Sequence, residues 1–100
     1  MIIYNVTVNV EDSIHDEWLT WMKTIHIPDV MNTGLFRECR FCKILSDEDT
    51  GTTYSFQYLC DNMETYEKYR DEFASALRNH VVEKFGDKFV AFRTLLEVIE

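Results

Sequence analysis

The chain has 100 residues, of which 46% are hydrophobic and 28% charged, a composition typical of one globular domain with its own core. Its 18 acidic residues against 10 Lys and Arg give a net charge of -8 at pH 7. This charge argues against nucleic acid or an anionic membrane as a partner, and the length argues against a multidomain enzyme. We therefore expect a single domain over residues 1–100.

No apolar run approaches the roughly 18 residues that a membrane-spanning helix needs, and no basic segment with a signal-like apolar core opens the chain. Three cysteines are an odd number and too few for a disulfide scaffold, which is typical of a reducing compartment. We expect a cytoplasmic protein with free thiols at Cys39, Cys42 and Cys60.

The first half of the chain begins with a strand and continues as a helix. Apolar and polar residues alternate over residues 2–10, which predicts a strand with one apolar face. A helix should start at Ser13, because acidic residues follow in its first turn. Its apolar stripe is Ile14, Trp18, either Trp21 or Met22, and Ile25. We expect Pro28 to interrupt this helix and Gly34 to end a short turn over residues 28–32.

Two strands and a second helix should follow. Residues 35–45 mix apolar and charged side chains but favour a strand by composition, and the turn formers of 46–51 predict a hairpin loop. Clean alternation over 53–60 predicts the next strand, antiparallel to the one before it. Helical spacing then runs for about five turns from Asp61 to Gly86.

The last segment, 89–99, again alternates and predicts a fourth strand. We expect the even-numbered apolar residues of the first, third and fourth strands to face the helices. The order strand, helix, strand, strand, helix, strand is the βαββαβ arrangement of the ferredoxin-like fold, an α+β fold in which both helices cover one face of a four-stranded antiparallel sheet.

The other face of this sheet should be partly apolar and therefore in need of a partner. Two copies packed sheet against sheet would form a homodimer, a dimeric α+β barrel, that buries Ile3, Phe89 and Leu95. Asn5 and polar neighbours would then line a cavity between the two sheets.

Three segments carry a resemblance to known proteins. The stretch HDEWLTWMKTIHIPDVMNTGLF, residues 15–36, is similar to the first helix and following loop of the dimeric α+β barrel superfamily. The whole chain resembles the short bacterial family DUF4286, found mainly in Bacteroidetes, through MIIYNVTVNV, the W-x-x-W-M-K-x-x-H-I-P-x-V-M element and FRTLLEVI. The superfamily includes cofactor-independent monooxygenases, haem-handling proteins and isomerases, so the resemblance implies a fold and no particular activity.

His26 is the candidate catalytic residue, because it lies where the first helix should meet Pro28. It could accept a proton or contact a ligand, or it could cap the helix C-terminus. Trp18 and Trp21 have helical spacing and are expected to be core residues, with one of them able to wall a pocket at its rim.

Arg93 is the candidate anion-binding residue of the open sheet face, with Asn5 and Gln57 as amide partners for a small anion or carbonyl compound. The alternative is an ion pair of Arg93 with Glu97 or Glu38.

We expect neither a metal nor a cofactor. Cys39 and Cys42 should point to opposite faces of a strand, and nucleotide, serine-hydrolase and zincin motifs are absent from the sequence. The favoured function is a non-enzymatic homodimer that binds a small molecule, or another protein, through its cavity. The alternative is a cofactor-independent monooxygenase or isomerase with His26 as proton acceptor. An RNA-binding domain is disfavoured by the net charge of -8.

Overall fold

Alternating apolar residues place two long strands in the middle of the sheet. The computed structural model describes residues 1–45 and 50–100. In it the central strands are β1 (Ile2–Val10) and β3 (Thr52–Cys60), which pair antiparallel with Tyr4 opposite Tyr58. Both strands turn their even-numbered side chains towards the helices, as the sequence predicts, and most of these side chains are buried.

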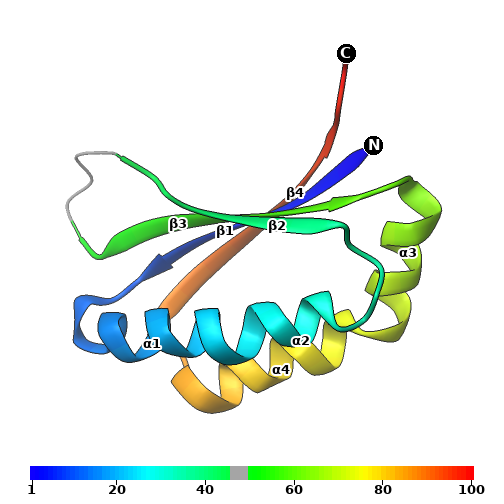
Figure 1. The fold of residues 1–100 in the computed structure, drawn as a ribbon. Coiled ribbons are helices and arrows are strands. Elements are labelled where there is room, and N and C mark those ends of the chain that lie inside the picture. The colour runs from blue at the N-terminus through cyan, green and yellow to red at the C-terminus, as the bar shows by residue number, and fades with distance from the viewer. Residues whose placement is uncertain (46–49) are drawn as a thin grey trace.

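The outer strands are β2 (Glu38–Lys43), beside β3, and β4 (Phe89–Glu97), beside β1. The sheet order is therefore β2-β3-β1-β4, with every pairing antiparallel. The helices lie together on one side of this sheet, and the two chain termini lie close together at one end (Figure 1). This is the predicted ferredoxin-like fold. Of the predicted hairpin loop, residues 46–49 lie outside the described part of the chain.

The first helical layer continues past Pro28, contrary to the prediction that this residue interrupts it. A 3-10 turn, η1 (Asp12–Ile14), leads into α1 (His15–Trp21), η2 (Met22–His26) and α2 (Ile27–Met31) without a break. The η2 segment is a π-helical turn, in which Ile27 N–H bonds to the carbonyl of Met22 five residues back. This wider turn directly precedes the proline and relieves the clash that its ring would make in a regular helix.

The second helical layer is divided where the sequence predicts one helix. It consists of α3 (Met63–Glu72) and α4 (Ala74–Phe85), joined at Phe73, whose backbone leaves helical geometry. Asn62 caps α3 by accepting a hydrogen bond from Thr65 N–H. Gly86, with φ of 64°, ends α4 as expected.

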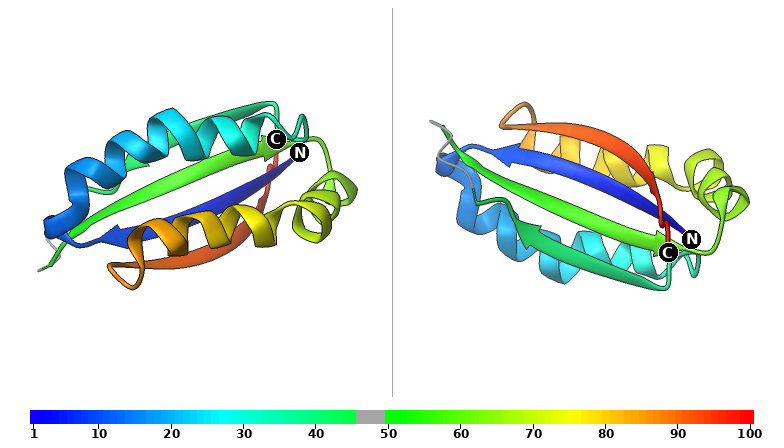
Figure 2. Two further views of the ribbon diagram at one scale, coloured as in Figure 1. Left: turned by 90° about the horizontal axis from the view of Figure 1, so that it is seen from below. Right: turned by 90° about the horizontal axis from the view of Figure 1, so that it is seen from above.

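The helices divide the covered face of the sheet between them. The rod α1–η2–α2 runs along the β2 and β3 side, whereas α4 runs along the β1 and β4 side (Figure 2). Trp18 is fully buried, with Tyr54, Phe56 and Phe41 within aromatic contact at centroid distances of 5.3 to 6.2 Å. At the other end, aromatic rings pack around Tyr4; they are Phe36, Tyr58, Tyr66 and Tyr69.

The register of β4 corrects one prediction. Val6 is paired with Arg93 and Val8 with Ala91, so the odd-numbered residues of β4 face the helices. Phe89 and Leu95, which we expected on the open face, therefore lie on the helix side. The apolar residues that β4 presents on the open face are instead Val90, Phe92 and Leu96. Directly paired residues of neighbouring strands share a face, which fixes this assignment.

Candidate functional site

A cavity lies between the helix layer and the sheet, within a single chain. We call it the chamber. Its volume is about 350 Å³, and its walls are mainly valine and aromatic side chains, with lining residues from β1, β3, β4, η2, α2, α3 and α4. The residues that line it are Tyr4, Val6, Val8, Met22, His26, Val30, Phe56, Tyr58, Tyr69, Arg78, Val81, Val82, Phe89, Ala91 and Arg93.

The chamber reaches solvent beside β4. Val82 on α4 is 52% exposed, and Arg93 on the edge strand β4 is also exposed, so these two lining residues mark the mouth. The opposite wall is formed by buried Tyr58, Phe56 and Val30. A ligand would therefore enter at the edge of the sheet and pass into an apolar interior.

Three side chains form a polar cluster in the chamber. Arg78 Nη2 donates to the hydroxyl oxygen of Tyr4 at 3.1 Å, and Arg93 Nε donates to the same oxygen at 3.2 Å. Tyr4 is buried on β1, while the two arginines reach it from α4 and β4. The topology thus brings residues 4, 78 and 93 of the chain together at one oxygen atom.

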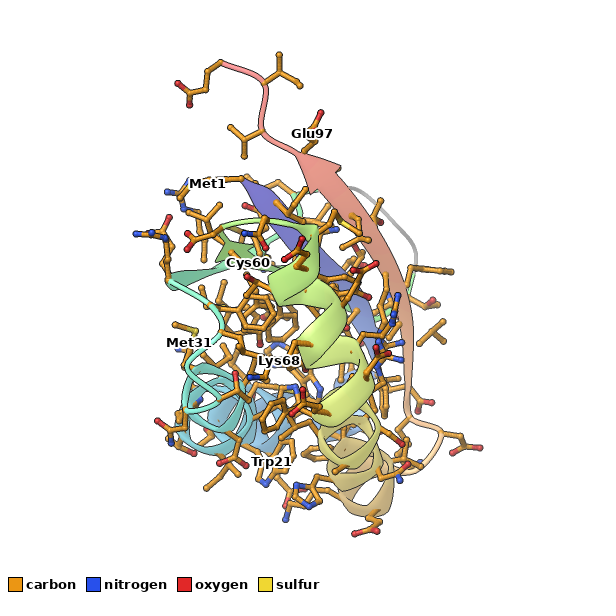
Figure 3. All side chains as sticks on the ribbon, turned by 90° about the vertical axis from the view of Figure 1, so that its right-hand side faces the viewer. Met1, Trp21, Met31, Cys60, Lys68 and Glu97 are labelled. Carbon is orange, nitrogen blue, oxygen red and sulfur yellow. The ribbon has the colours of Figure 1, made fainter. Side chains whose placement is uncertain are left out.

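His26 projects into the chamber from the last position of the π turn. Its ring stacks on Trp21, with centroids 5.8 Å apart, and Trp21 in turn meets the edge of Phe85. Trp21 lies in the helix layer, between α1 and α4 (Figure 3). Burial lowers the pKa of His26 to about 4, opposed by the negative charge of Asp29 and helped by His80 and Arg93. The imidazole facing the chamber is therefore neutral at pH 7.

Two tyrosines of the wall are held in the protonated form. Burial raises the pKa of Tyr58 and of Tyr69 above the usual range of a phenol. The Tyr58 hydroxyl lies within reach of the Cys39 thiol, whose sulfur is a weak acceptor. Each hydroxyl therefore keeps an O–H group that can donate.

The structure divides the predicted site residues into three groups. His26 and Arg93 line the chamber, whereas Asn5 and Gln57 lie on the opposite, open face of the sheet, paired across β1 and β3. Trp18 and Trp21 pack among the helices and the core without lining the chamber. The predicted grouping of Arg93 with Asn5 and Gln57 is wrong, because the register of β4 turns Arg93 to the other face.

Other proposed roles also change. Since the helix continues to Met31, His26 does not cap its C-terminus. In the described chain Arg93 bonds to Tyr4 and forms no ion pair with Glu97 or Glu38. Asn5 instead accepts a hydrogen bond from the Ser55 hydroxyl at 2.6 Å and donates to Thr7, so its amide is used within the open face.

Sequence reasoning missed Tyr4 and Arg78. Arg78 is one residue beyond the buried Leu77 and shares a helix face with Val81 and Val82, which also line the chamber. That spacing is the one sequence signal that could have placed Arg78 at the chamber. For Tyr4 the sequence pattern predicts only a core position, because this residue belongs to the apolar stripe of β1.

Within residues 1–45 and 50–100, no cluster of three or more His, Cys, Asp or Glu side chains is placed to hold a metal ion. Nor does any helix in that part of the chain have the length and apolar character needed to cross a membrane.

The low pKa of His26 predicts a pH-dependent stability. In the unfolded chain His26 should titrate near its ordinary pKa of 6.5, and in the folded chain near 4, so the unfolded state binds more protons between these values. The free energy of unfolding should therefore fall as the pH drops from about 6.5 to 4, by up to about 3 kcal/mol from this group. Urea unfolding at several pH values measures this change in the free energy of unfolding.

Two variants separate this effect from the titration of carboxylates. His26→Gln should remove the His26 contribution, so that its difference in stability from the wild type shrinks as the pH falls. Asn79→Gln, at an exposed helix position, adds and removes no titratable group and should leave the pH dependence unchanged. A histidine titration by NMR that places the folded pKa of His26 near 6.5 would contradict the prediction.

Comparison with solved structures shows what this geometry resembles. MhuD, in a mutant form crystallised with two manganese protoporphyrin IX molecules per active site, has a TM-score of 0.72 at 13% identity, covering 100% of this chain and 96% of that one. An antibiotic biosynthesis monooxygenase has a TM-score of 0.71 at 10% identity, with both chains covered completely. A dimeric ferredoxin-like protein from an uncultured marine organism reaches 0.71 at 8% identity, covering 99% and 95%.

These identities establish the shared fold and nothing about activity. No curated protein matches the chain in sequence. A family model described as a domain of unknown function, DUF4286, matches residues 1–99.

Proposed function

The chain belongs to the DUF4286 family, whose description assigns no role, and from the geometry we propose that it binds one small, largely apolar molecule in the chamber. The observation that carries the proposal is a cavity of about 350 Å³ with apolar walls and a few polar groups at one end. That size and lining are typical of small-molecule sites. Since a water molecule takes up about 30 Å³, the chamber suits roughly a dozen non-hydrogen atoms.

Binding is better supported than proton abstraction, the alternative role for His26. A general base is most effective when its pKa lies near the working pH. The pKa of His26 is lowered to about 4, so its imidazole is a weak base at pH 7. It remains a good hydrogen-bond partner, and its stacking on Trp21 fixes the orientation of the ring. His26 is therefore assigned to ligand contact.

The protein acts as a homodimer in this proposal. No helix of residues 1–45 or 50–100 covers the open sheet face (Figure 2), and its β4 side exposes Val90 by 55%, Phe92 by 63% and Leu96 by 42%. An apolar strip of this kind on an edge strand favours association with a second copy. The dimeric ferredoxin-like proteins of the same fold support this reading. The three free cysteines fit a cytoplasmic location.

The test uses 1-naphthamide, an uncharged bicyclic probe of about a dozen non-hydrogen atoms, in calorimetric titration and methyl NMR. Saturable binding that shifts the methyl signals of Val81 and Ala91 is expected. Ala91→Phe should weaken it at least about tenfold, because the added ring occupies the chamber.

The matched control is Ala76→Phe, the same substitution at an exposed position of α4 outside the chamber. Circular dichroism establishes that both variants fold. No saturable binding to the wild type, or equal binding to the Ala91→Phe and Ala76→Phe variants, would refute a ligand site in the chamber.

A further inference from the structure

Every polar group in the cluster at Tyr4 is a hydrogen-bond donor. The Tyr4 oxygen already accepts one N–H from Arg78 and one from Arg93, which uses both of its lone pairs. Its own O–H hydrogen remains, and within the described residues no acceptor is recorded for it. Each guanidinium has five N–H donors, of which the phenol takes one. The cluster therefore has a surplus of donors and lacks an acceptor.

The surplus includes a buried, charged atom. Arg78 Nε is inaccessible to solvent and has no hydrogen-bond partner among the described residues. A buried donor left unpaired destabilises a fold by about 1–3 kcal/mol, and more when it is charged. Such a donor in the wall of the chamber indicates that a bound molecule supplies the acceptor.

The charges of Arg78 and Arg93 also favour a bound acceptor, and one that is negatively charged. In the described chain, no carboxylate lies within ion-pairing distance of Arg78 or Arg93, although the sequence has 18 acidic residues and a net charge of -8. Two guanidinium groups that meet at one neutral oxygen repel each other. An anion between them would remove this repulsion and use the free N–H groups in paired hydrogen bonds, the geometry in which arginine binds carboxylates.

We propose that the ligand of the chamber is a monocarboxylate with an apolar body, its carboxylate held by Arg78, Arg93 and the Tyr4 hydroxyl. The valine and aromatic walls require a body that is hydrocarbon-like, which an inorganic anion does not have. The mouth beside Arg93 allows the charged end to stay near solvent while the body enters the interior. This inference rests on the proposed function and specifies the class of ligand.

The experiment compares 1-naphthoic acid, which is ionised at pH 7, with 1-naphthamide, which has the same ring system and no charge. Calorimetric titration of the wild type should give at least about tenfold tighter binding of the acid, because charge-assisted hydrogen bonds contribute more than neutral ones. Arg78→Met and Arg93→Met should each reduce this preference to within about threefold; the readout is the ratio of the two affinities within one variant, which a general loss of fit to the chamber would not change.

Arg70→Met is the control. Arg70 is exposed on α3 and pairs with Asp71, and its replacement changes the net charge by the same amount as Arg78→Met or Arg93→Met. It should keep the tenfold preference. Arg93 is exposed, so its replacement tests the proposal even if Arg78→Met fails to fold. Inorganic phosphate should not compete with the acid at equal concentration.

The outcomes separate the two proposals. Equal binding of acid and amide to the wild type overturns the carboxylate assignment and leaves the binding function standing. Absence of binding for both probes overturns both. An equal loss of preference in the Arg70→Met variant, or competition by phosphate, also overturns the assignment, because it would show general attraction of anions.

Discussion

Replacing Trp18 with Ala should lower the free energy of unfolding by about 3–5 kcal/mol, the range for deleting a large aromatic side chain from a core. Trp18 is 0% exposed and contacts Tyr54, Phe56 and Phe41, so its removal leaves a cavity between α1 and the sheet. For a domain of this size the melting temperature should drop by at least about 12 °C. Urea and thermal unfolding followed by circular dichroism measure both quantities.

Two comparisons sharpen this prediction. Trp21→Ala should have a clearly smaller effect, because Trp21 is only partly buried and packs on His26 and Phe85. Trp18→Phe should lower the free energy of unfolding by less than about 2 kcal/mol, because it also removes an indole N–H that has no partner among the described residues. An equal decrease in the free energy of unfolding for Trp18→Ala and Trp21→Ala would show that Trp18 is not central to the core.

Phe92→Glu should convert the proposed homodimer into monomers. Phe92 is 63% exposed on the open face, next to Thr7 of β1, so two sheets packed on this face would bury its ring. A charge placed there without a partner should weaken association by at least about 2 kcal/mol, or roughly 30-fold in the dissociation constant. Analytical ultracentrifugation at micromolar concentration distinguishes the dimer from one chain of 11.9 kDa.

The control is Met63→Glu, which also introduces an acid at an exposed apolar residue but lies on α3, away from the open face. This variant should remain dimeric. Circular dichroism shows whether the Phe92→Glu chain keeps its fold as a monomer. A wild-type protein that sediments as a single chain, or a Phe92→Glu protein that stays dimeric, contradicts the proposed interface.

Periodicity was sufficient to predict the central sheet because β1 and β3 have one clearly apolar face each. In β4 it was ambiguous: Phe89, Val90, Phe92, Leu95 and Leu96 put apolar side chains on both faces. Only the register against β1 determines that Arg93 lies beside Val6 and faces the helices. The strand was therefore predicted correctly and its inward face wrongly, which put Arg93 on the open face with Asn5 and Gln57.

Local sequence pattern also predicts the helices only in part. Sequence spacing located α1, α4 and the ending glycine Gly86, because these depend on local pattern. The π turn before Pro28 and the break at Phe73 depend on how each helix fits the sheet beneath it, which no local pattern reports. His26 was recognised through its position beside Pro28, whereas Arg78 and Tyr4 became site residues only through long-range contacts.

The π turn over Met22–His26 also determines how the helix before it is oriented relative to the helix after it. A π-helical residue turns by only about 80°, against about 100° in an α-helix, so the five residues here turn about as far as four α-helical ones. If the same five residues wound as a regular α-helix, everything before them would rotate by roughly 90° relative to Ile27–Met31, and Trp18 would turn away from the sheet while Val30 stayed in place. The wide turn therefore absorbs one extra residue and keeps both of these buried side chains facing the sheet.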